Sequence, residues 1–105
     1  MSEKIIAGIT VEVNEEGFLV DPHSWTEEMA PALAESVEIY DLTELHWKVI
    51  NFMRADFFER GSIPTIRRIK NAGGVPTKEL YRLFPNGPAK KAALIAGLGK
   101  PQGCI

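Results

Sequence analysis

The sequence predicts a mainly α protein, a small orthogonal helical bundle with an N-terminal β-hairpin and a flexible C-terminal arm. The chain has 105 residues, the size of one small domain, so we expect residues 1–105 to form a single domain. Apolar side chains recur at helical spacing through most of the chain, and glycine or proline divides it into short segments. Short helices with short connections favour a compact bundle with mostly local contacts.

The hairpin is predicted near the N-terminus. Residues 9–13 alternate apolar and polar side chains, as a half-buried strand does. A turn that ends in glycine follows over residues 14–17, and then a second apolar run over residues 18–20. Two short β-prone runs on either side of such a turn are typical of a hairpin, so we expect these two runs to pair.

A first helix is predicted after the turn cluster and helix start at residues 21–24. Its apolar side chains recur at helical spacing: Trp25, Met29, Leu33 and Val37. Pro31 lies inside this pattern, where it either kinks the helix or marks the first turn of a shorter one. The sequence leaves both alternatives open.

The central helix is predicted to begin after residues 41–44, which resemble a capping box, and to end at Gly61. Its apolar side chains cover more than one stripe, so this helix should form the core with several neighbours packed on it. They are Trp47, Val49, Ile50, Phe52, Met53, Phe57 and Phe58. We interpret His46 as a structural group rather than a site residue, because a lone histidine on an apolar helix usually finds its partners within the fold.

Three short helices are predicted to follow, over residues 63–72, 77–84 and 89–96. Pro64 opens the first, Pro85 stops the second and Gly97 closes the third. The first two, joined by a glycine-containing turn, resemble a helix-turn-helix with basic side chains suited to phosphates. The second of them begins Thr77-Lys78-Glu79, which offers little for reading base edges.

The charge is divided between the two halves of the chain. Residues 1–59 carry a net charge of −10 and residues 60–105 one of +8, within an overall charge of −2. Either the halves neutralise each other across one surface, or the basic half meets an anionic partner. The sequence favours neither alternative.

Several classes of function find no support in the composition. One cysteine cannot form an internal disulfide or build a zinc site, and we predict no metal and no cofactor. No segment approaches the roughly 20 apolar residues that span a bilayer. The N-terminus lacks a signal-peptide pattern, so we expect a cytoplasmic protein that does not bind membranes.

The last nine residues, GLGKPQGCI, form the predicted arm over residues 97–105. Glycine leaves the backbone free and proline interrupts a helix, so we expect this arm to be mobile. It holds the one cysteine, Cys104, next to the C-terminal residue. The composition leaves two alternatives open: a reactive thiol on a short arm held out from the folded body, or a frayed tail with an incidental cysteine.

Five segments of the chain together resemble one family, that of the dissimilatory sulfite reductase gamma-like proteins (DsrC) and the tRNA 2-thiouridine sulfur-relay protein TusE. They are EEGFLVDPHSW at 15–25, HWKVINFMR at 46–54, IPTIRRI at 63–69, LYRLFPNGPAKKA at 80–92 and IAGLGKPQGCI at 95–105. They cover nearly the whole chain in the order of the family.

The resemblance implies a sulfur carrier. Members of the family take up sulfur as a persulfide on the penultimate cysteine, here Cys104, and deliver it to a partner. The implied partners are an upstream sulfur donor protein and a downstream acceptor, which is a tRNA-thiolating enzyme or a sulfite reductase-like complex. A thiolate is the species that accepts sulfur, and nearby cations favour it. The candidate partner-binding cations are Lys100, Arg67, Arg68, Lys90 and Lys91.

Two departures from the family pattern refine this expectation. Members that serve sulfite reductase carry a second cysteine where this chain has Ala93, so the resemblance is to single-cysteine, TusE-like members. The second departure is Gly99, which stands where the family usually has proline. The length of residues 71–80 argues against a simple TusE assignment, because it resembles that of sulfate-reducer gamma proteins and looks shorter than in TusE. The alternatives are an interaction or regulatory subunit associated with sulfite reductase, and a helix-turn-helix regulator that binds DNA.

Overall fold

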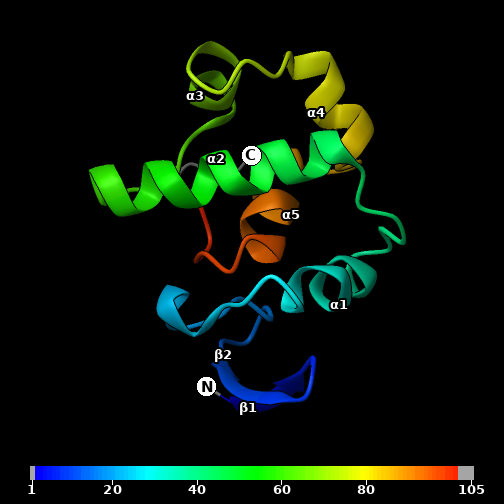
Figure 1. The fold of residues 1–105 in the computed structure, drawn as a ribbon, viewed down its shortest axis with the longest axis vertical. Helices are drawn as coiled ribbons and strands as arrows, with labels where there is room; N and C mark the ends of the chain where they lie inside the picture. Colours follow the sequence, from blue (N-terminus) through cyan, green and yellow to red (C-terminus); the bar gives the residue numbers. More distant parts are fainter. Residues whose placement is uncertain (1, 102–105) are drawn as a thin grey trace.

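The computed structural model describes residues 2–101 as a mainly helical bundle with an N-terminal hairpin, as predicted. In chain order the elements are β1 (Ser2–Ile6), β2 (Ile9–Val13), a 3-10 turn η1 (Pro22–Ser24), α1 (Met29–Ser36), α2 (Glu44–Arg60), α3 (Ile66–Asn71), α4 (Thr77–Leu83) and α5 (Pro88–Ile95). The long helix α2 crosses the middle of the molecule. The hairpin, α1 and α5 lie on one side of it, and α3 and α4 on the other (Figure 1).

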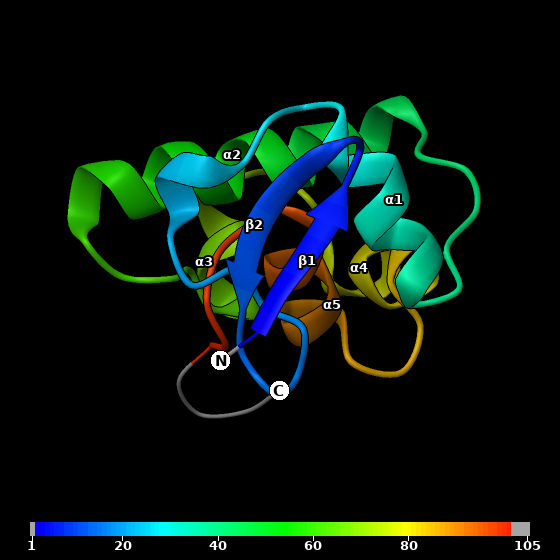
Figure 2. The same cartoon turned by 90° about the horizontal axis from the view of Figure 1, so that it is seen from below.

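The hairpin uses a different partner strand from the predicted one. β1 pairs antiparallel with β2, from Ser2 opposite Val13 to Ile6 opposite Ile9. The two residues between them, Ala7 and Gly8, both have positive φ angles, of 52° and 79°. Paired left-handed residues give a turn whose twist matches that of the two strands. Figure 2 views the molecule from the side of the hairpin, with β1 and β2 in front of the helices.

Residues 18–20 were expected to form the second strand, and this was wrong. They keep a single bridge to β2, between Val13 and Leu19. Phe18 and Leu19 are both buried, at 0% and 2% exposure, although they are neighbours in sequence. Successive side chains of a strand point to opposite faces, so a segment that buries two in a row does not continue a sheet with one solvated face.

Pro31 marks the first turn of a short helix, the second of the two alternatives that the sequence left open. α1 begins at Met29, so Pro31 lies where backbone N–H groups have no partner within the helix. Trp25 is outside the helix, with an extended backbone at the end of η1. Its side chain is therefore free to pack elsewhere, as described below.

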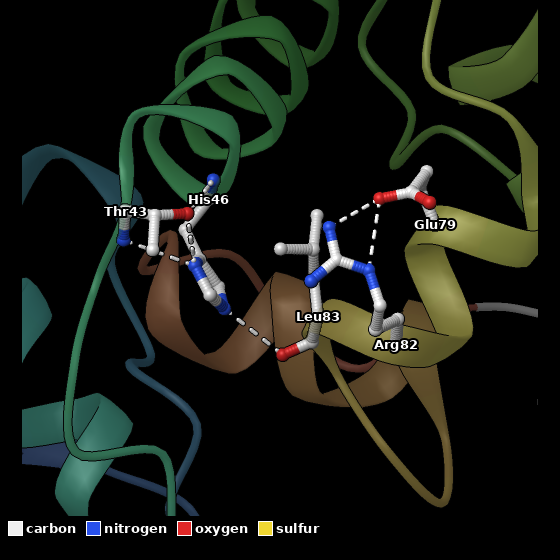
Figure 3. Close-up of polar contacts among 5 residues, drawn as sticks. All are labelled: Thr43, His46, Glu79, Arg82 and Leu83. Carbon is white, nitrogen blue, oxygen red and sulfur yellow. Dashed lines mark hydrogen bonds and ion pairs between the residues drawn. The ribbon is translucent and has the colours of Figure 1, made fainter.

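The cap of α2 differs from the predicted one. The N-cap is Thr43 rather than Asp41, and its partner in the capping box is His46 rather than a glutamate. The backbone N–H of Thr43 donates to Nδ1 of His46 at 3.0 Å, while His46 Nε2 donates to the carbonyl of Leu83 at 3.0 Å (Figure 3). His46 is 6% exposed and meets the ring of Phe84 edge-on. These contacts agree with a structural role and join α2 to α4.

We expect His46→Ala to lower the free energy of unfolding by about 2–4 kcal/mol, because it removes two hydrogen bonds and leaves a cavity beside Phe84. Urea unfolding of the full chain measures this change. His23→Ala is the control, since the side chain of His23 is 79% exposed and should contribute little. Equal losses in the two variants would contradict the structural role of His46.

The remaining helices follow the prediction with one shift. α3 begins at Ile66 instead of residue 63, because Thr65 is its N-cap and accepts a hydrogen bond from the backbone of Arg68 at 3.1 Å. Proline disfavours a helical conformation in the residue before it, so Ile63 stays outside the helix. In the part of the chain that the structure describes, no helix has the length and apolarity needed to cross a membrane.

The core lies between α2 and its neighbours and is less broad on α2 than predicted. The buried side chains of that helix form one stripe, His46, Val49, Ile50, Met53 and Asp56. The other apolar groups are only partly covered: Trp47, Phe52 and Phe57 are half-buried, and Phe58 is 46% exposed. α5 supplies much of the facing surface, because Ala92, Ala93 and Ile95 have no exposed area.

Candidate functional site: the C-terminal segment

The end of α5 determines where the C-terminal segment leaves the bundle. Gly97 has a φ of 73°, in the left-handed region. Its N–H donates to the carbonyl of Leu94 at 3.1 Å, and the N–H of Leu98 donates to the carbonyl of Ala93 at 2.9 Å. This pair of bonds is a Schellman cap, which usually brings the next apolar residue back onto the helix. Leu98 is fully buried, and the segment then runs toward α2 (Figure 1).

Trp25 packs directly on this cap. Its Nε1 donates to the carbonyl of Ile95 at 2.9 Å, one of the carbonyls at the end of α5. Its ring lies so close to Gly97 that a Cβ at that position would be 2.3 Å from Trp25 Cδ1. Glycine is required here by both the backbone angle and the ring.

Arg54 of α2 completes the cap. One guanidinium nitrogen donates to the carbonyl of Ala96 at 2.8 Å and the other to the carbonyl of Pro22 at 3.1 Å. The guanidinium also lies over the ring of Trp25, 4.2 Å from its centroid. Desolvation lowers the pKa of Arg54, and the two carbonyls and the π face compensate for the lost water. The start of the C-terminal segment is thus held by the cap of α5, by the ring of Trp25 and by Arg54 of α2.

Lys100 is bound to the body of the protein. Its Nζ lies 3.1 Å from Oε2 of Glu16, and Nζ of Lys90, on α5, lies 3.3 Å from Oε1 of the same carboxylate. The hydrogen bond from Lys100, followed by that from Lys90, lowers the pKa of Glu16. Lys91, the neighbour of Lys90, is half-buried. The structure therefore joins two of the predicted partner-binding cations on a carboxylate that the sequence did not single out.

The two predicted arginines lie apart from this carboxylate, on α3. Arg68 donates to Oδ1 of Asp56 through Nε at 3.2 Å and through Nη2 at 2.8 Å. The Asp56 side chain is only 5% exposed, and its hydrogen bonds raise the pKa of Arg68. Arg68 therefore neutralises a buried carboxylate. Arg67 is exposed and lines a surface hollow of about 330 Å³ together with Arg60.

The acidic and basic halves of the sequence are only partly separated in space. The hairpin and α1 belong to the acidic half, and α3 and α4, on the other side of α2, belong to the basic half (Figure 1). α5 also belongs to the basic half but packs on α1, and contacts such as Lys100 with Glu16 and Arg68 with Asp56 neutralise single charges where the halves meet. Both alternatives from the sequence therefore stay open.

Cys104 lies outside the described residues, which end at Pro101. Pro101 is buried. Cys104 follows it by three residues, so chain geometry limits the distance between their Cα atoms to about 11 Å. Residues 97–101 of the predicted mobile arm are held against the body, and for residues 102–105, which lie outside the described residues, mobility stays a prediction. Within residues 2–101, no group of three or more histidine, cysteine, aspartate or glutamate side chains is placed to hold a metal ion.

Trp25, Arg54 and Glu16 were not recognised as site residues from the sequence. A signal was present, because all three lie in segments that carry the family resemblance, 15–25 and 46–54. The helical and strand patterns of those segments, however, contain nothing that connects them with the C-terminus. Their common feature is that each contacts residues 95–100.

The fold and this segment define a class of small helical proteins, in which the last helix ends in a glycine cap and the residues that follow it, 97–101, are held against the body. The chain belongs to the family described as "DsrC like protein", whose model matches residues 5–105. It is 38% identical over 105 residues to the gamma subunit of the dissimilatory-type sulfite reductase of Nitratidesulfovibrio vulgaris, with 100% of both chains covered. It is 43% identical to the sulfurtransferase TusE of Pectobacterium atrosepticum, over 93% of this chain and 95% of that protein.

Solved structures confirm the fold class. The crystal structure of dissimilatory sulfite reductase I (DsrI) superposes with a TM-score of 0.88 at 35% identity, covering 99% of this chain and 100% of that one. The oxidised gamma subunit (DsrC) from Archaeoglobus fulgidus superposes with a TM-score of 0.80 at 38% identity, with the same coverage. The family resemblance read from the sequence is therefore confirmed.

Proposed function

We propose that this protein is a sulfur carrier, which accepts sulfur as a persulfide on Cys104 and delivers it to a partner enzyme. One observation carries the proposal: the single thiol of the chain stands next to its C-terminus, on the terminal segment of a DsrC-like fold. The similarity to a protein named as the sulfurtransferase TusE supports the same function. The relay is proposed to operate in the cytoplasm.

The chemistry needs only the thiolate of Cys104. It attacks the outer sulfur of a donor persulfide, so that a new S–S bond forms on Cys104 while the S–S bond of the donor breaks. The donor leaves as a thiolate, and no external oxidant or reductant is consumed. Delivery repeats the step, with an acceptor nucleophile attacking the outer sulfur on Cys104. Thiolate character at each attacking sulfur determines the rate.

A single cysteine favours transfer over internal oxidation. Position 93 holds a fully buried alanine, so no second thiol of the same chain can displace the outer sulfur and close a disulfide. The persulfide then waits for an acceptor that supplies its own nucleophile. This supports a relay of the TusE kind rather than a two-cysteine redox cycle.

The proposed partners are a sulfur donor protein and an acceptor enzyme, either a tRNA-thiolating enzyme or a sulfite reductase-like complex. A sulfite reductase gamma subunit and a sulfurtransferase TusE both match nearly the full chain. An interaction subunit of a sulfite reductase, with its arm docked but without turnover, is the alternative within the family. Stable co-purification with such a reductase, without sulfur loading, would favour that alternative.

Intact-protein mass spectrometry tests the carrier function. We expect the protein to gain one sulfur atom from a small-molecule persulfide donor and to lose it on reduction. Protein whose thiol has been blocked with iodoacetamide is the control and should gain none. If reduced, unblocked protein gains no sulfur from several donors, the proposal is wrong.

A DNA-binding regulator is the alternative from a different class, and the observation that bears on it is the helix pair α3–α4. Arg68 is bound to Asp56, and Arg82 to Glu79 on its own helix (Figure 3), which leaves fewer cations for phosphates. The suitable variant is Arg67→Ala, because Arg68→Ala would leave a buried carboxylate unpaired. DNA retention at low salt that this variant loses would support the alternative, and no retention eliminates it.

A further inference from the structure

Glu16 connects three segments that are distant in the sequence. It belongs to the turn after β2, Lys90 to α5, and Lys100 to the C-terminal segment. Lys100 is 84 residues away in the chain and reaches both oxygens of the carboxylate, at 3.1 and 3.3 Å. The same turn and Lys100 line a surface hollow of about 450 Å³. Nothing in the proposed transfer chemistry uses this carboxylate.

The turn holds Glu16 in a defined place. The side chain of Asn14 accepts hydrogen bonds from the backbone N–H groups of Glu16, at 2.9 Å, and of Phe18, at 3.0 Å. The backbone N–H of Asn14 donates in turn to the carbonyl of Phe18 at 2.9 Å. Phe18 is fully buried, so this asparagine turn is fixed to the core. Glu16 is therefore presented from a rigid base.

The C-terminal segment is held on both sides of Lys100. Leu98 and Pro101 are buried, and Gly99 runs past Ile63, whose Cδ1 would be 3.9 Å from an added Cβ. Measured from Gly97, a free arm would let Cys104 reach about 25 Å, whereas measured from Pro101 the limit is about 11 Å. The point of attachment therefore decides how large a volume the thiol can search.

We propose that Glu16 is a positioning residue: its carboxylate, which Lys90 ties to α5, clamps Lys100 and so sets the point from which the chain leads on to Cys104. The inference rests on the proposed function for its purpose, because a shorter arm concentrates the thiol near one face of the protein. The clamp itself is a property of the free protein. Exposed ion pairs are individually weak, which suits a contact that opens when a partner docks.

Glu16→Gln and its neighbour Glu15→Gln provide a matched comparison. Both carboxylates line the same hollow, and both variants remove one negative charge near the segment, but only Glu16 binds the lysines. Two readouts are taken at low salt and fixed pH: the ¹⁵N heteronuclear NOE of Gly99 and Lys100, and the rate of Cys104 alkylation by iodoacetamide. We expect Glu16→Gln to lower both NOEs and to raise the rate about two- to fourfold, in keeping with the strength of exposed pairs.

Charge exchange separates the clamp from a general effect of the turn. Glu16→Lys should release the segment as Glu16→Gln does, and Glu16→Lys combined with Lys100→Glu should restore the wild-type NOEs and rate. At 0.5 M NaCl the wild type should approach the Glu16→Gln values, because salt screens exposed pairs. Equal behaviour of the two glutamine variants, or no recovery in the exchanged pair, would overturn the proposal.

The proposed clamp and the proposed carrier function can be disproved independently of each other. Alkylation and NOE need no sulfur donor, so a clamp that passes these tests stands even if the protein never accepts sulfur. Normal sulfur loading with no difference between Glu15→Gln and Glu16→Gln would leave the carrier function intact and remove the clamp.

Discussion

Cys104→Ser should abolish sulfur loading completely while leaving the fold unchanged. The chain has one cysteine, so the variant has no thiol left to attack a persulfide, and a serine hydroxyl is not ionised at neutral pH. Among the described residues, the buried core runs from Ile6 to Leu98 without any contribution from a thiol. Intact mass after exposure to a persulfide donor measures the loading, and thermal unfolding checks the fold.

Two outcomes would contradict this prediction. Sulfur gain equal to that of the wild type would mean that the mass does not report a persulfide on Cys104. A large fall in the melting temperature would mean that the thiol has a structural role, and the loss of loading would then say little about transfer. The wild type blocked with iodoacetamide links the two experiments, because it removes the thiol from protein that has already folded.

Gly97→Ala should destabilise the protein by about 3–5 kcal/mol, the largest loss that we expect from adding one methyl group to this chain. Three effects combine. A left-handed φ strains a residue that has a Cβ, and this Cβ would lie 2.3 Å from a ring atom of Trp25. Moving the ring away weakens its hydrogen bond to Ile95. Urea unfolding measures the loss.

Gly61→Ala is the matched control, because Gly61 also ends a helix in the left-handed region. Its φ is 79° against 73° for Gly97, but nothing lies within 4 Å of an added Cβ. Its cost should therefore be that of the backbone alone, about 1–2 kcal/mol. If the two variants lose the same stability, the contact between Trp25 and the cap of α5 is not a tight one.

The local features of the fold were largely predictable. The five α-helices within residues 2–101, the stop at Gly61 and the stop at Gly97 follow from helical spacing and from the backbone freedom of glycine, which act within a few residues. The choice of strand was not. Residues 2–6 carry a weak β signal, and their pairing with residues 9–13 depends on a two-residue turn with left-handed angles that the sequence Ala7-Gly8 only partly indicates.

The capping of α2 also could not be predicted correctly from local sequence rules. The rule for a capping box calls for an acid or amide at its third position, and this led to Asp41 and Glu44. The structure uses Thr43 and His46, because a histidine ring can accept from the N-cap backbone with one nitrogen and donate to Leu83 with the other. That second bond crosses 37 residues, so no local rule contains it.

By itself, the sequence determined the fold class, the family and the one cysteine on which the proposed sulfur transfer depends, because composition, periodicity and motifs are properties of the chain. Only the tertiary structure decided what surrounds the segment that leads to this thiol. Trp25 meets Ile95 across 70 residues, and Lys100 meets Glu16 across 84. The physical reason is that hydrogen bonds and ion pairs form between groups that packing brings together, and packing depends on the whole core.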